Sequence, residues 1–270
     1  MRHYLSRKLV APGYSRVQIA LAGCGGTGSH LLTGLTNLHK ALLERGHSGF
    51  HLTVFDPDTV SEANIGRQRF FPSDVGFNKA AVLVTRVNQS CGLLWDAVPD
   101  ELSNDRNYDL VISAVDTVKA RLEIRSLFNQ ASYYKDAYWL DVGNQKNSGQ
   151  IILGTTGEFN QPNAPEGIEY LGRLPCVTDL YDLTQVKEET QGPSCSLAEA
   201  LEHQDLMINP IIADYAIHLL WTGFNQGFLT SHGYFVNLES ESGVRSLPVN
   251  REVWKRMGFK MRKPRALKAV

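Results

Sequence analysis

The chain of 270 residues has few cysteines, and it lacks the residue pairs that would define a disulfide-rich or zinc-binding protein. Its four cysteines, Cys24, Cys91, Cys176 and Cys195, lie far apart, and none belongs to a CxxC pair. This spacing argues against a disulfide framework and favours a reducing, cytoplasmic location. A structural zinc site needs close pairs of ligands, which neither the cysteines nor the eight histidines provide. We therefore expect no zinc.

Long apolar runs and a large net charge are also missing. No stretch approaches the roughly 18 apolar residues of a membrane span, and the basic start "MRHYLSRKLVAPGYSR" has no apolar signal core. The net charge of −1 gives no general indication of a nucleic-acid or membrane surface. The exception is the stretch 251–270, which carries eight Lys or Arg against one Glu. We expect no membrane partner, and only this tail keeps nucleic acid open as an alternative.

Predicted strands and helices alternate along most of the chain. The apolar patterns predict strands at 17–23, 50–56, 108–116, 137–143 and 149–154, and helices at 29–44, 78–89, 118–128 and 197–221. A hairpin is expected at 233–238 and 243–249. The alternation indicates an α/β fold with a mostly parallel sheet and helices on both faces. We expect one domain at 1–250, which includes a long crossover loop at 155–195, and a basic tail at 251–270.

A glycine-rich motif, "GCGGTGS" at 23–29, connects the first predicted strand to the first long helix. Gly23, Gly25 and Gly28 have the GxGxxG spacing, and Gly26 lies within it. Glycines let the backbone approach a phosphate, and the helix N-terminus offers free N–H groups to it. The motif predicts a nucleotide site but does not define the chemistry, because it would suit a dinucleotide dehydrogenase equally well.

An unusual set of acids and cations follows the second strand in "FDPDTVSEANIGRQRFF" at 55–71. Asp56 ends that strand, where an acid can bind ribose hydroxyls, and Asp58 is either a second site residue or a turn residue. Arg67 and Lys79 can bind phosphate oxygens. Asp116 ends the strand at 108–116 and can hold Mg²⁺ through oxygen.

Charge distinguishes the two nucleotide classes. The glycine turn and helix end can largely neutralise the roughly two negative charges of a dinucleotide pyrophosphate. ATP carries about four, and attack at its α-phosphate calls for further cations and a metal. Alone, Arg67 or Lys79 could be a surface ion-pair partner and Asp116 a helix cap. Their joint placement at strand and helix ends favours ATP with Mg²⁺.

The chain resembles the ThiF/MoeB/ubiquitin-activating-enzyme superfamily over residues 4–248, both in these motifs and in the order in which they occur. The matching stretches are "GCGGTGS", "DPDTVSEANIGRQ", "GFNKA" and "DTVKAR", with Ile65 as the one departure in the second. The resemblance implies a Rossmann-like adenylation fold and a homodimer. Within the superfamily, "LPCVTDLY" and "PSCSLAEALEHQDLMIN" are most similar to the ThiF-like member of the plasmid-borne PRTRC cassette.

The resemblance also implies a role for each polar residue of these motifs. They are Asp56 at the ribose with Asp58 beside it, Asn64, Arg67 and Gln68 around the triphosphate, Lys79 at phosphate, Asp116 at magnesium, and Arg121 in support of that site. In "YLSRKLVAP", Arg7 takes the position of an arginine that enters the partner's ATP site across a two-fold axis. The other interpretation of Arg7 is a basic, disordered start.

The resemblance points to a cysteine that could receive the activated acyl group. Cys195 aligns with a reactive cysteine before the last helix, and a thiolate at a helix start has a lowered pKa. Cys176 aligns with the first cysteine of the family's zinc knuckle, in which Asp179 replaces the second, and this leaves Cys176 free for another role. Three possibilities stay open: Cys195 as the catalytic acceptor, Cys176, or neither.

Four functional hypotheses follow from these observations. The favoured one is ATP-dependent adenylation of the C-terminal carboxylate of a ubiquitin-like or sulfur-carrier protein, with transfer to a cysteine and a conjugating-enzyme-like protein as a further partner. The second is an adenylating enzyme of the same fold that acts on tRNA or a peptide. The third, an NAD-dependent oxidoreductase, leaves Arg67, Lys79 and Asp116 without a role. The fourth is an inactive binding scaffold, which the intact set of charged residues disfavours.

Overall fold

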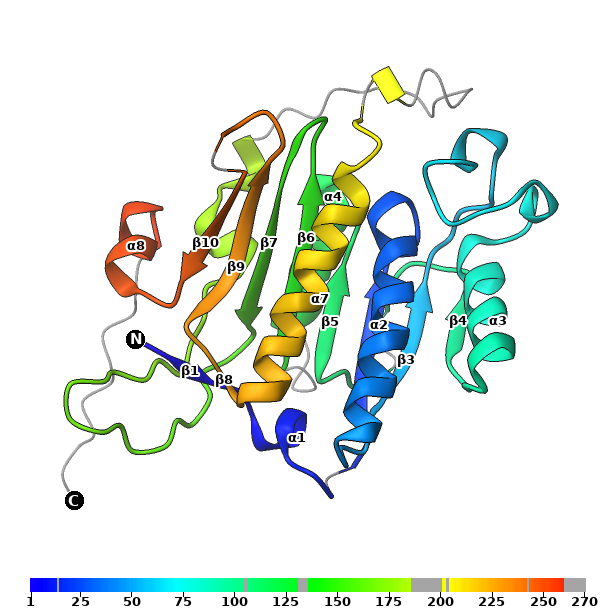
Figure 1. The fold of residues 1–270 in the computed structure, drawn as a ribbon. Helices are drawn as coiled ribbons and strands as arrows, with labels where there is room; N and C mark the ends of the chain where they lie inside the picture. The colour runs from blue at the N-terminus through cyan, green and yellow to red at the C-terminus, as the bar shows by residue number, and fades with distance from the viewer. Residues whose placement is uncertain are drawn as a thin grey trace.

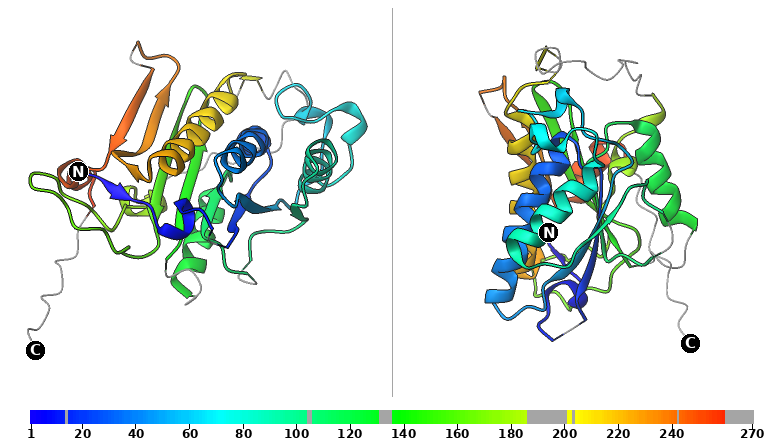
Figure 2. Two further views of the ribbon diagram at one scale, coloured as in Figure 1. Left: turned by 60° about the horizontal axis from the view of Figure 1, so that its bottom comes forward. Right: turned by 90° about the vertical axis from the view of Figure 1, so that its right-hand side faces the viewer.

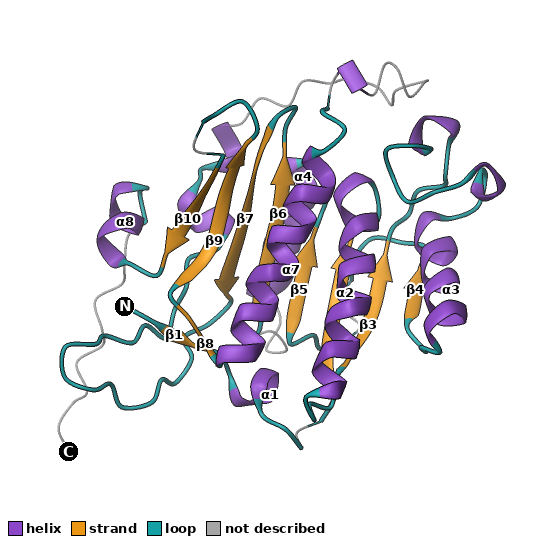
Figure 3. Ribbon diagram, in the orientation of Figure 1, coloured by secondary structure: helices purple, strands orange, loops and turns teal. Residues whose placement is uncertain are grey.

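The computed structural model of the chain describes residues 1–13, 15–103, 106–130, 136–185, 201–202, 204–241 and 243–259. Its centre is an eight-stranded sheet in the order β10-β9-β7-β6-β5-β2-β3-β4 (Figures 1 and 3). The strands from β6 to β4 pair in parallel, whereas β7, β9 and β10 pair in antiparallel fashion. The predicted α/β fold, with a mostly parallel sheet and a C-terminal antiparallel hairpin, is confirmed. No helix of the described ranges is long and apolar enough to span a membrane.

The elements have the following bounds. The strands of the large sheet are β2 (Val17–Ala22), β3 (Phe50–Phe55), β4 (Asp96–Val98), β5 (Leu110–Ser113), β6 (Tyr138–Asn144), β7 (Ser148–Thr155), β9 (Ser231–Asn237) and β10 (Val244–Pro248). The α-helices are α1 (Arg7–Val10), α2 (Gly26–Glu44), α3 (Lys79–Cys91), α4 (Val118–Gln130), α5 (Val177–Leu180), α7 (Ile208–Gln226) and α8 (Arg251–Arg256). In the described ranges the short 3₁₀ helices are η1 (Glu62–Asn64), η2 (Pro72–Asp74) and η4 (Leu183–Gln185). A separate two-stranded sheet pairs β1 (His3–Tyr4) with β8 (Phe228–Leu229).

Helices cover both faces of the sheet, with α2, α3 and α7 on one face and α4 on the other (Figure 2). Strand β2 shows how the sequence produces this arrangement. Its large side chains Ile19 and Leu21 belong to the core cluster that contains α2 and α7, whereas the small Ala20 and Ala22 belong to the cluster beneath α4. A strand with two buried faces needs a continuous apolar run, and "VQIALA" supplies one.

The described part of the crossover loop packs against the sheet as part of the core. Leu171, Leu174, Cys176 and Val177 are buried in the cluster beneath α4. The same stretch pairs with the N-terminus, where Arg2 bridges to Tyr170. Periodicity failed to reveal this packing because these residues lie in an irregular segment and at the start of the four-residue helix α5. Residues 186–195 of the predicted loop lie outside the described residues.

Two predicted helices differ from the structure. The helix predicted at 197–221 is not continuous: residues 197–200 lie outside the described residues, 201–202 are helical, and 204–207 form a bend and a turn before α7 begins at Ile208. The physical reason is Pro210, which is disfavoured inside a helix but tolerated in the first turn, where it lies here. Helix α2 begins at Gly26, within the glycine motif, rather than at 29.

The C-terminal boundary also differs from the prediction, because residues 251–259 are not a free tail. Asn250 caps α8 by accepting hydrogen bonds from the backbone N–H groups of Glu252 and Val253, and Trp254 is fully buried. Trp254 packs edge-on against His232 of β9, with ring centroids 5.1 Å apart. The rest of the basic stretch, residues 260–270, lies outside the described residues.

Candidate functional site

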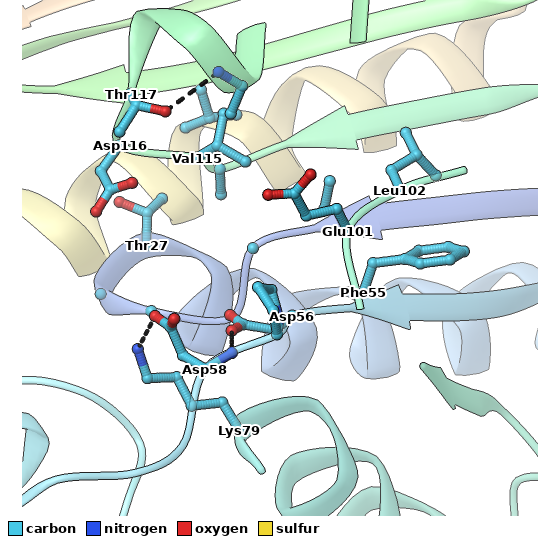
Figure 4. Close-up of a pocket in the computed structure, with 18 of the residues that line it drawn as sticks. Thr27, Phe55, Asp56, Asp58, Lys79, Glu101, Leu102, Val115, Asp116 and Thr117 are labelled. Carbon is cyan, nitrogen blue, oxygen red and sulfur yellow. Dashed lines mark hydrogen bonds and ion pairs between the residues drawn. The ribbon is translucent and has the colours of Figure 1, made fainter. Parts of the chain in front are cut away.

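A cavity of about 640 Å³ opens where β2, β3 and β5 end and α2 begins (Figure 4). Carboxyl ends of parallel strands are where ligands bind in open α/β sheets. The predicted site residues that line it are Gly23, Gly25, Gly26, Asp56, Asp58, Arg67, Gln68, Lys79 and Asp116. Residues far apart in the sequence are therefore brought together around one space. Gly28, Asn64 and Arg7 are not among the lining residues.

The glycine motif forms a tight turn from β2 into α2. Gly23 has a φ of +92°, and a Cβ there would lie 2.6 Å from the carbonyl oxygen of Ala114. A Cβ on Gly28 would lie 2.0 Å from the carbonyl oxygen of Gly23, so Gly28 allows the helix to approach the strand rather than contacting a ligand itself. Gly25 has open space where a side chain would be. The free N–H groups of the α2 N-terminus thus lie at the cavity, which suits an anion.

Asp56 is buried directly beside this turn. One carboxylate oxygen accepts a hydrogen bond from the backbone N–H of Cys24 at 2.5 Å, and the other accepts one from the N–H of Asp58 at 2.9 Å. Burial raises the pKa of Asp56, and these two hydrogen bonds oppose that rise. Asp56 therefore holds the glycine turn in place in addition to facing the cavity, where its remaining lone pairs can accept from a ribose hydroxyl.

Lys79 is the first residue of α3, and its side chain is nearly buried. Its Nζ lies 2.8 Å from a carboxylate oxygen of Asp58, whose own side chain is 66% exposed (Figure 4). Asn78 caps the helix by accepting from the N–H of Ala81 at 2.9 Å, and it also donates to the carbonyl of Asp56 at 2.7 Å. The start of α3 is thereby fixed against the end of β3, which aims the lysine at the cavity.

Arg67 and Gln68 bring unsatisfied polar atoms to the cavity. The guanidinium of Arg67 is half-buried, and burial lowers its pKa. Its Nη1 donates to the side-chain oxygen of Gln204. Among the described residues, neither the Nε of Arg67 nor the Oε1 of Gln68 has a hydrogen-bond partner, although both atoms are buried. Buried polar atoms are normally paired, so these two are candidates to bind a ligand.

Asp116 follows β5 and is exposed at the cavity (Figure 4). Carboxylates are the donors that Mg²⁺ prefers, and Asp58 also lines this space, so the donor set fits that ion. Arg121, expected to support this site, does not line the cavity. Its Nε donates to Asp141 at 3.1 Å in a nearly buried ion pair.

Several polar residues at the cavity were missed by the sequence reasoning. Asn209, in the first turn of α7, accepts hydrogen bonds through Oδ1 from Thr27 and from Asn144, both at 2.9 Å. Its Nδ2 donates to Gln204 at 2.9 Å. Asn144 ends β6 as Asp116 follows β5, so the strand-end rule could have found it. Glu101 and Glu123 also line the cavity, and no local motif marks them.

Asn64 and Arg7 do not line the cavity, although the carbonyl of Asn64 accepts from the N–H of the lining residue Gln68 at 3.0 Å. The side-chain oxygen of Asn64 accepts a hydrogen bond from the N–H of Ser61 at 2.9 Å and so closes the turn at η1. Arg7 is exposed on α1, and the carbonyl of the nearby Leu9 pairs with His47 just past the end of α2. That is the end of α2 remote from the glycine turn (Figure 1). The roles of Asn64 and Arg7 at a nucleotide stay predictions.

The two candidate acceptor cysteines differ in what the structure says of them. Cys176 is fully buried, and burial raises the pKa of its thiol to about 12. Its Sγ lies 3.5 Å from the carbonyl of Thr155. A buried thiol with a raised pKa is a poor nucleophile. Cys195 lies outside the described residues, so its role stays a prediction.

Asp179, at the expected position of the second zinc-knuckle cysteine, forms ion pairs with two arginines. Asp179 accepts from Arg125 at 3.3 Å and lies 3.6 Å from Arg173. In the parts of the chain that the structure describes, no group of three or more His, Cys, Asp or Glu could hold a metal ion together. The expectation of no zinc stays a prediction.

The chain belongs to the ThiF family, whose sequence model matches residues 13–252. It is similar to ubiquitin-like modifier-activating enzyme 5 of Branchiostoma floridae, with 27% identity over 178 residues, and of Oryza sativa subsp. japonica, with 29% over 179 residues. Each match covers 57% of this chain but only 41% and 39% of the two relatives. The chain thus spans about two-fifths of the length of these curated relatives.

Solved structures share the fold at low sequence identity. A structure of E. coli MccB has a TM-score of 0.55 at 13% identity, covering 87% of this chain and 63% of MccB. A structure of MccB with ATP has a TM-score of 0.53 at 14% identity, covering 87% and 64%. PaaA gives 0.53 at 14%, covering 86% and 64%. At such identities the likeness shows the fold alone.

Proposed function

We propose that this chain is an ATP-dependent adenylating enzyme that acts on the C-terminal carboxylate of a ubiquitin-like or sulfur-carrier protein. The observation that carries the proposal is one cavity lined by the glycine turn, Asp56, Arg67, Lys79 and Asp116. Such a cavity offers anion-binding N–H groups, two cations and metal-binding oxygen together. Membership of the ThiF family and likeness to ubiquitin-like modifier-activating enzymes support adenylation of the type that begins ubiquitin-like activation.

The proposed first step is a substitution at phosphorus. A carboxylate oxygen of the carrier forms a bond to the α-phosphorus of ATP, and the bond from that phosphorus to the oxygen bridging to the β-phosphorus breaks. Pyrophosphate leaves with the electron pair, and an acyl-adenylate remains. A carboxylate is already a nucleophile, so the step needs no general base. The protein contributes orientation and electrostatic stabilisation.

The residues of the cavity take the following roles in this proposal. Arg67 and Lys79 bind phosphate oxygens, and Lys79 can exchange its exposed partner Asp58 for phosphate. The N–H groups at the start of α2 bind further phosphate oxygens, and Asp56 accepts from the ribose. Magnesium, when bound, neutralises charge on the triphosphate, and Asp116 with Asp58 supplies the oxygen ligands that would hold it.

A second step would move the acyl group to a thiol. The thiolate of Cys195 attacks the acyl carbon, and AMP leaves with its phosphate oxygen, so that a thioester forms. The support for Cys195 comes from the sequence, together with the burial of the competing Cys176. A conjugating-enzyme-like protein that receives the acyl group, and an origin in the PRTRC cassette, belong to the same proposal and rest on the motifs alone.

A homodimer is part of the proposal because of where Arg7 lies. Helix α1, which begins with Arg7, lies near the end of α2 opposite to the glycine turn (Figure 1). In this proposal Arg7 therefore acts at ATP only in a second copy's site. Replacement of Arg7 by Ala tests this. We expect the wild type to be a dimer, the variant to bind ATP more weakly, and mixed dimers with the wild type to regain affinity. A monomeric wild type would contradict the dimer.

The alternatives differ in the ligand that they require. Adenylation of a peptide or a tRNA base shares the first step and would show pyrophosphate exchange with that substrate only. An oxidoreductase would bind NADH tightly. Against it, Arg67, Lys79 and Asp116 all line the nucleotide cavity, and a dinucleotide site has no evident use for them.

The experiment that tests the proposal is ATP–pyrophosphate exchange. The protein is mixed with ATP, Mg²⁺, radiolabelled pyrophosphate and a small carrier protein that ends in Gly. Label is expected to enter ATP only with the carrier present and its C-terminus intact. A carrier with a C-terminal amide is the matched control, because it cannot attack phosphorus. Absence of exchange with every plausible carrier would overturn the proposal.

A further inference from the structure

Arg67 and Lys79 face the same cavity, but they are held by different kinds of partner. Lys79 is paired with the carboxylate of Asp58. Arg67 donates to a neutral amide oxygen, that of Gln204. Within the described part of the chain, its guanidinium forms no ion pair, and its Nε is left without a partner. The charge of Arg67 is therefore oriented but not neutralised.

Gln204 is itself fixed from the other side. Its Oε1 also accepts a hydrogen bond from Nδ2 of Asn209 at 2.9 Å. The amide oxygen of Asn209 in turn accepts from Thr27 and Asn144, each at 2.9 Å. One chain of side-chain hydrogen bonds thus joins Arg67 to the glycine turn. Apart from Arg67, every member of this chain is uncharged.

The position of Asn209 is closely defined by the glycine turn. A Cβ on Gly26 would lie 2.6 Å from Oδ1 of Asn209, so the amide packs directly against the turn's backbone. Because α7 begins at Ile208, Asn209 lies in the first turn of this helix. The hydrogen bonds through Gln204 and Asn209 therefore fix the guanidinium of Arg67 relative to the N–H groups of the glycine turn.

We propose that Gln204 is a positioning residue for the nucleotide's phosphates: its amide oxygen orients the Arg67 guanidinium toward the cavity and, being neutral, leaves the positive charge available to phosphate. The inference rests on the proposed function for the identity of the ligand. A carboxylate at this position would keep the hydrogen bond but form an ion pair with Arg67 and add a negative charge near the phosphates. An apolar side chain would release the guanidinium.

The test compares ATP with adenosine, which lacks phosphates, by calorimetric titration of the whole chain with Mg²⁺ present. For Gln204→Glu the Kd of ATP is expected to rise about tenfold or more, the size of a lost charge-assisted contact. The Kd of adenosine should not change. Gln226→Glu, at the exposed far end of α7, is the matched control for added charge, and its two Kd values should equal those of the wild type.

Gln204→Met keeps the test decisive if Gln204→Glu does not fold. This variant preserves length and neutrality but lacks the acceptor, and we expect a Kd for ATP raised several-fold with unchanged adenosine binding. Equal ATP affinity in wild type and both Gln204 variants would overturn the inference. So would an equal loss for ATP and adenosine, which would indicate a merely structural role. A wild type that binds adenosine but gains nothing from the phosphates would overturn the proposed function as well.

Discussion

The two halves of the sheet place titratable side chains in opposite situations. At the carboxyl ends of β2, β3 and β5, Asp116 is exposed, Lys79 is held by an exposed carboxylate, and Arg67 is held by an amide. On the antiparallel side, His232 of β9 is fully buried, and so is His3 of β1 in the separate two-stranded sheet. Burial lowers the pKa of each of these histidines to about 4.

This difference distinguishes side chains that can bind a ligand from side chains that stabilise the core. The buried imidazoles stay neutral and donate or accept within the core, where His232 pairs with the carbonyl of Leu153 at 2.8 Å and His3 with Tyr138 at 3.0 Å. Both side chains are fully buried and serve as structural groups. Among the described residues, the Nε2 of His232 also lacks a hydrogen-bond partner, but it lies inside the core. The Nε of Arg67 and the Oε1 of Gln68 lie instead on residues that line the cavity. The unused bonding capacity of these two atoms is what a ligand can satisfy.

Asp116→Ala should have the largest effect at the cavity edge. If Asp116 supplies a metal ligand for phosphate chemistry, carrier-dependent pyrophosphate exchange should fall by about a thousandfold, with an unchanged melting temperature. Asp214→Ala, which removes an exposed carboxylate from α7 away from the cavity, should leave exchange intact. Loss of exchange in both variants would contradict a specific role of the Asp116 carboxylate at the cavity.

Acidification tests the buried side of the comparison. Between pH 6.5 and about 4 the unfolded chain binds protons at His3 and His232 that the folded chain does not. Stability is therefore retained above pH 6.5 and lost as pH falls through this window, by about 3 kcal/mol for each histidine. Asp56 and Asp141 have raised pKa values and act in the opposite direction. Urea unfolding of His232→Phe should show a weaker loss across the window than the wild type. An unchanged pH dependence would contradict buried, neutral histidines.

Gly28→Ala tests a residue that combines both roles, ligand binding and packing. Gly28 belongs to the phosphate motif but does not line the cavity. The new methyl group would meet the carbonyl of Gly23 at 2.0 Å, so the turn must shift. We expect a loss of about 1–3 kcal/mol in unfolding free energy, together with weaker ATP binding. Thr33→Ala, at an exposed position on the same helix, is the control and should be nearly neutral. Wild-type stability in Gly28→Ala would show that the backbone contact is not tight.

Cys195→Ala should have the smallest effect on the first step. Pyrophosphate exchange should equal that of the wild type, because adenylation takes place before the thiol attacks the acyl-adenylate. A thiol-sensitive adduct with the carrier, seen on a non-reducing gel, should disappear. If the adduct persists in Cys195→Ala and is lost in Cys176→Ala, the assignment of the acceptor is reversed.

The sequence was sufficient to predict the fold and most of the cavity wall for identifiable reasons. Buried parallel strands require continuous apolar runs, and "VQIALA" and "FHLTVF" are such runs. Residues such as Asp56 and Asp116 follow directly after strands, so topology alone places them at one edge. Short or polar elements gave no such signal, and β4, of three residues beginning with Asp96, was missed.

The remainder of the site could not be predicted because it depends on contacts between distant segments. Asn209 lies 182 positions from its partner Thr27, and Gln204 lies 137 from Arg67. Nothing in the local sequence around Gln204 indicates that its amide will meet a guanidinium. Likewise, the partner of Arg121 is Asp141 of β6, and only the three-dimensional structure reveals that neither residue lines the cavity.

The most direct test is a crystal structure of the chain with a non-hydrolysable ATP analogue and Mg²⁺. We predict that the guanidinium of Arg67 and the ammonium of Lys79 each lie within hydrogen-bond distance of phosphate oxygens, with the α-phosphate at the glycine turn. A structure in which both cations face bulk water, remote from every phosphate, would contradict a site built for attack on ATP.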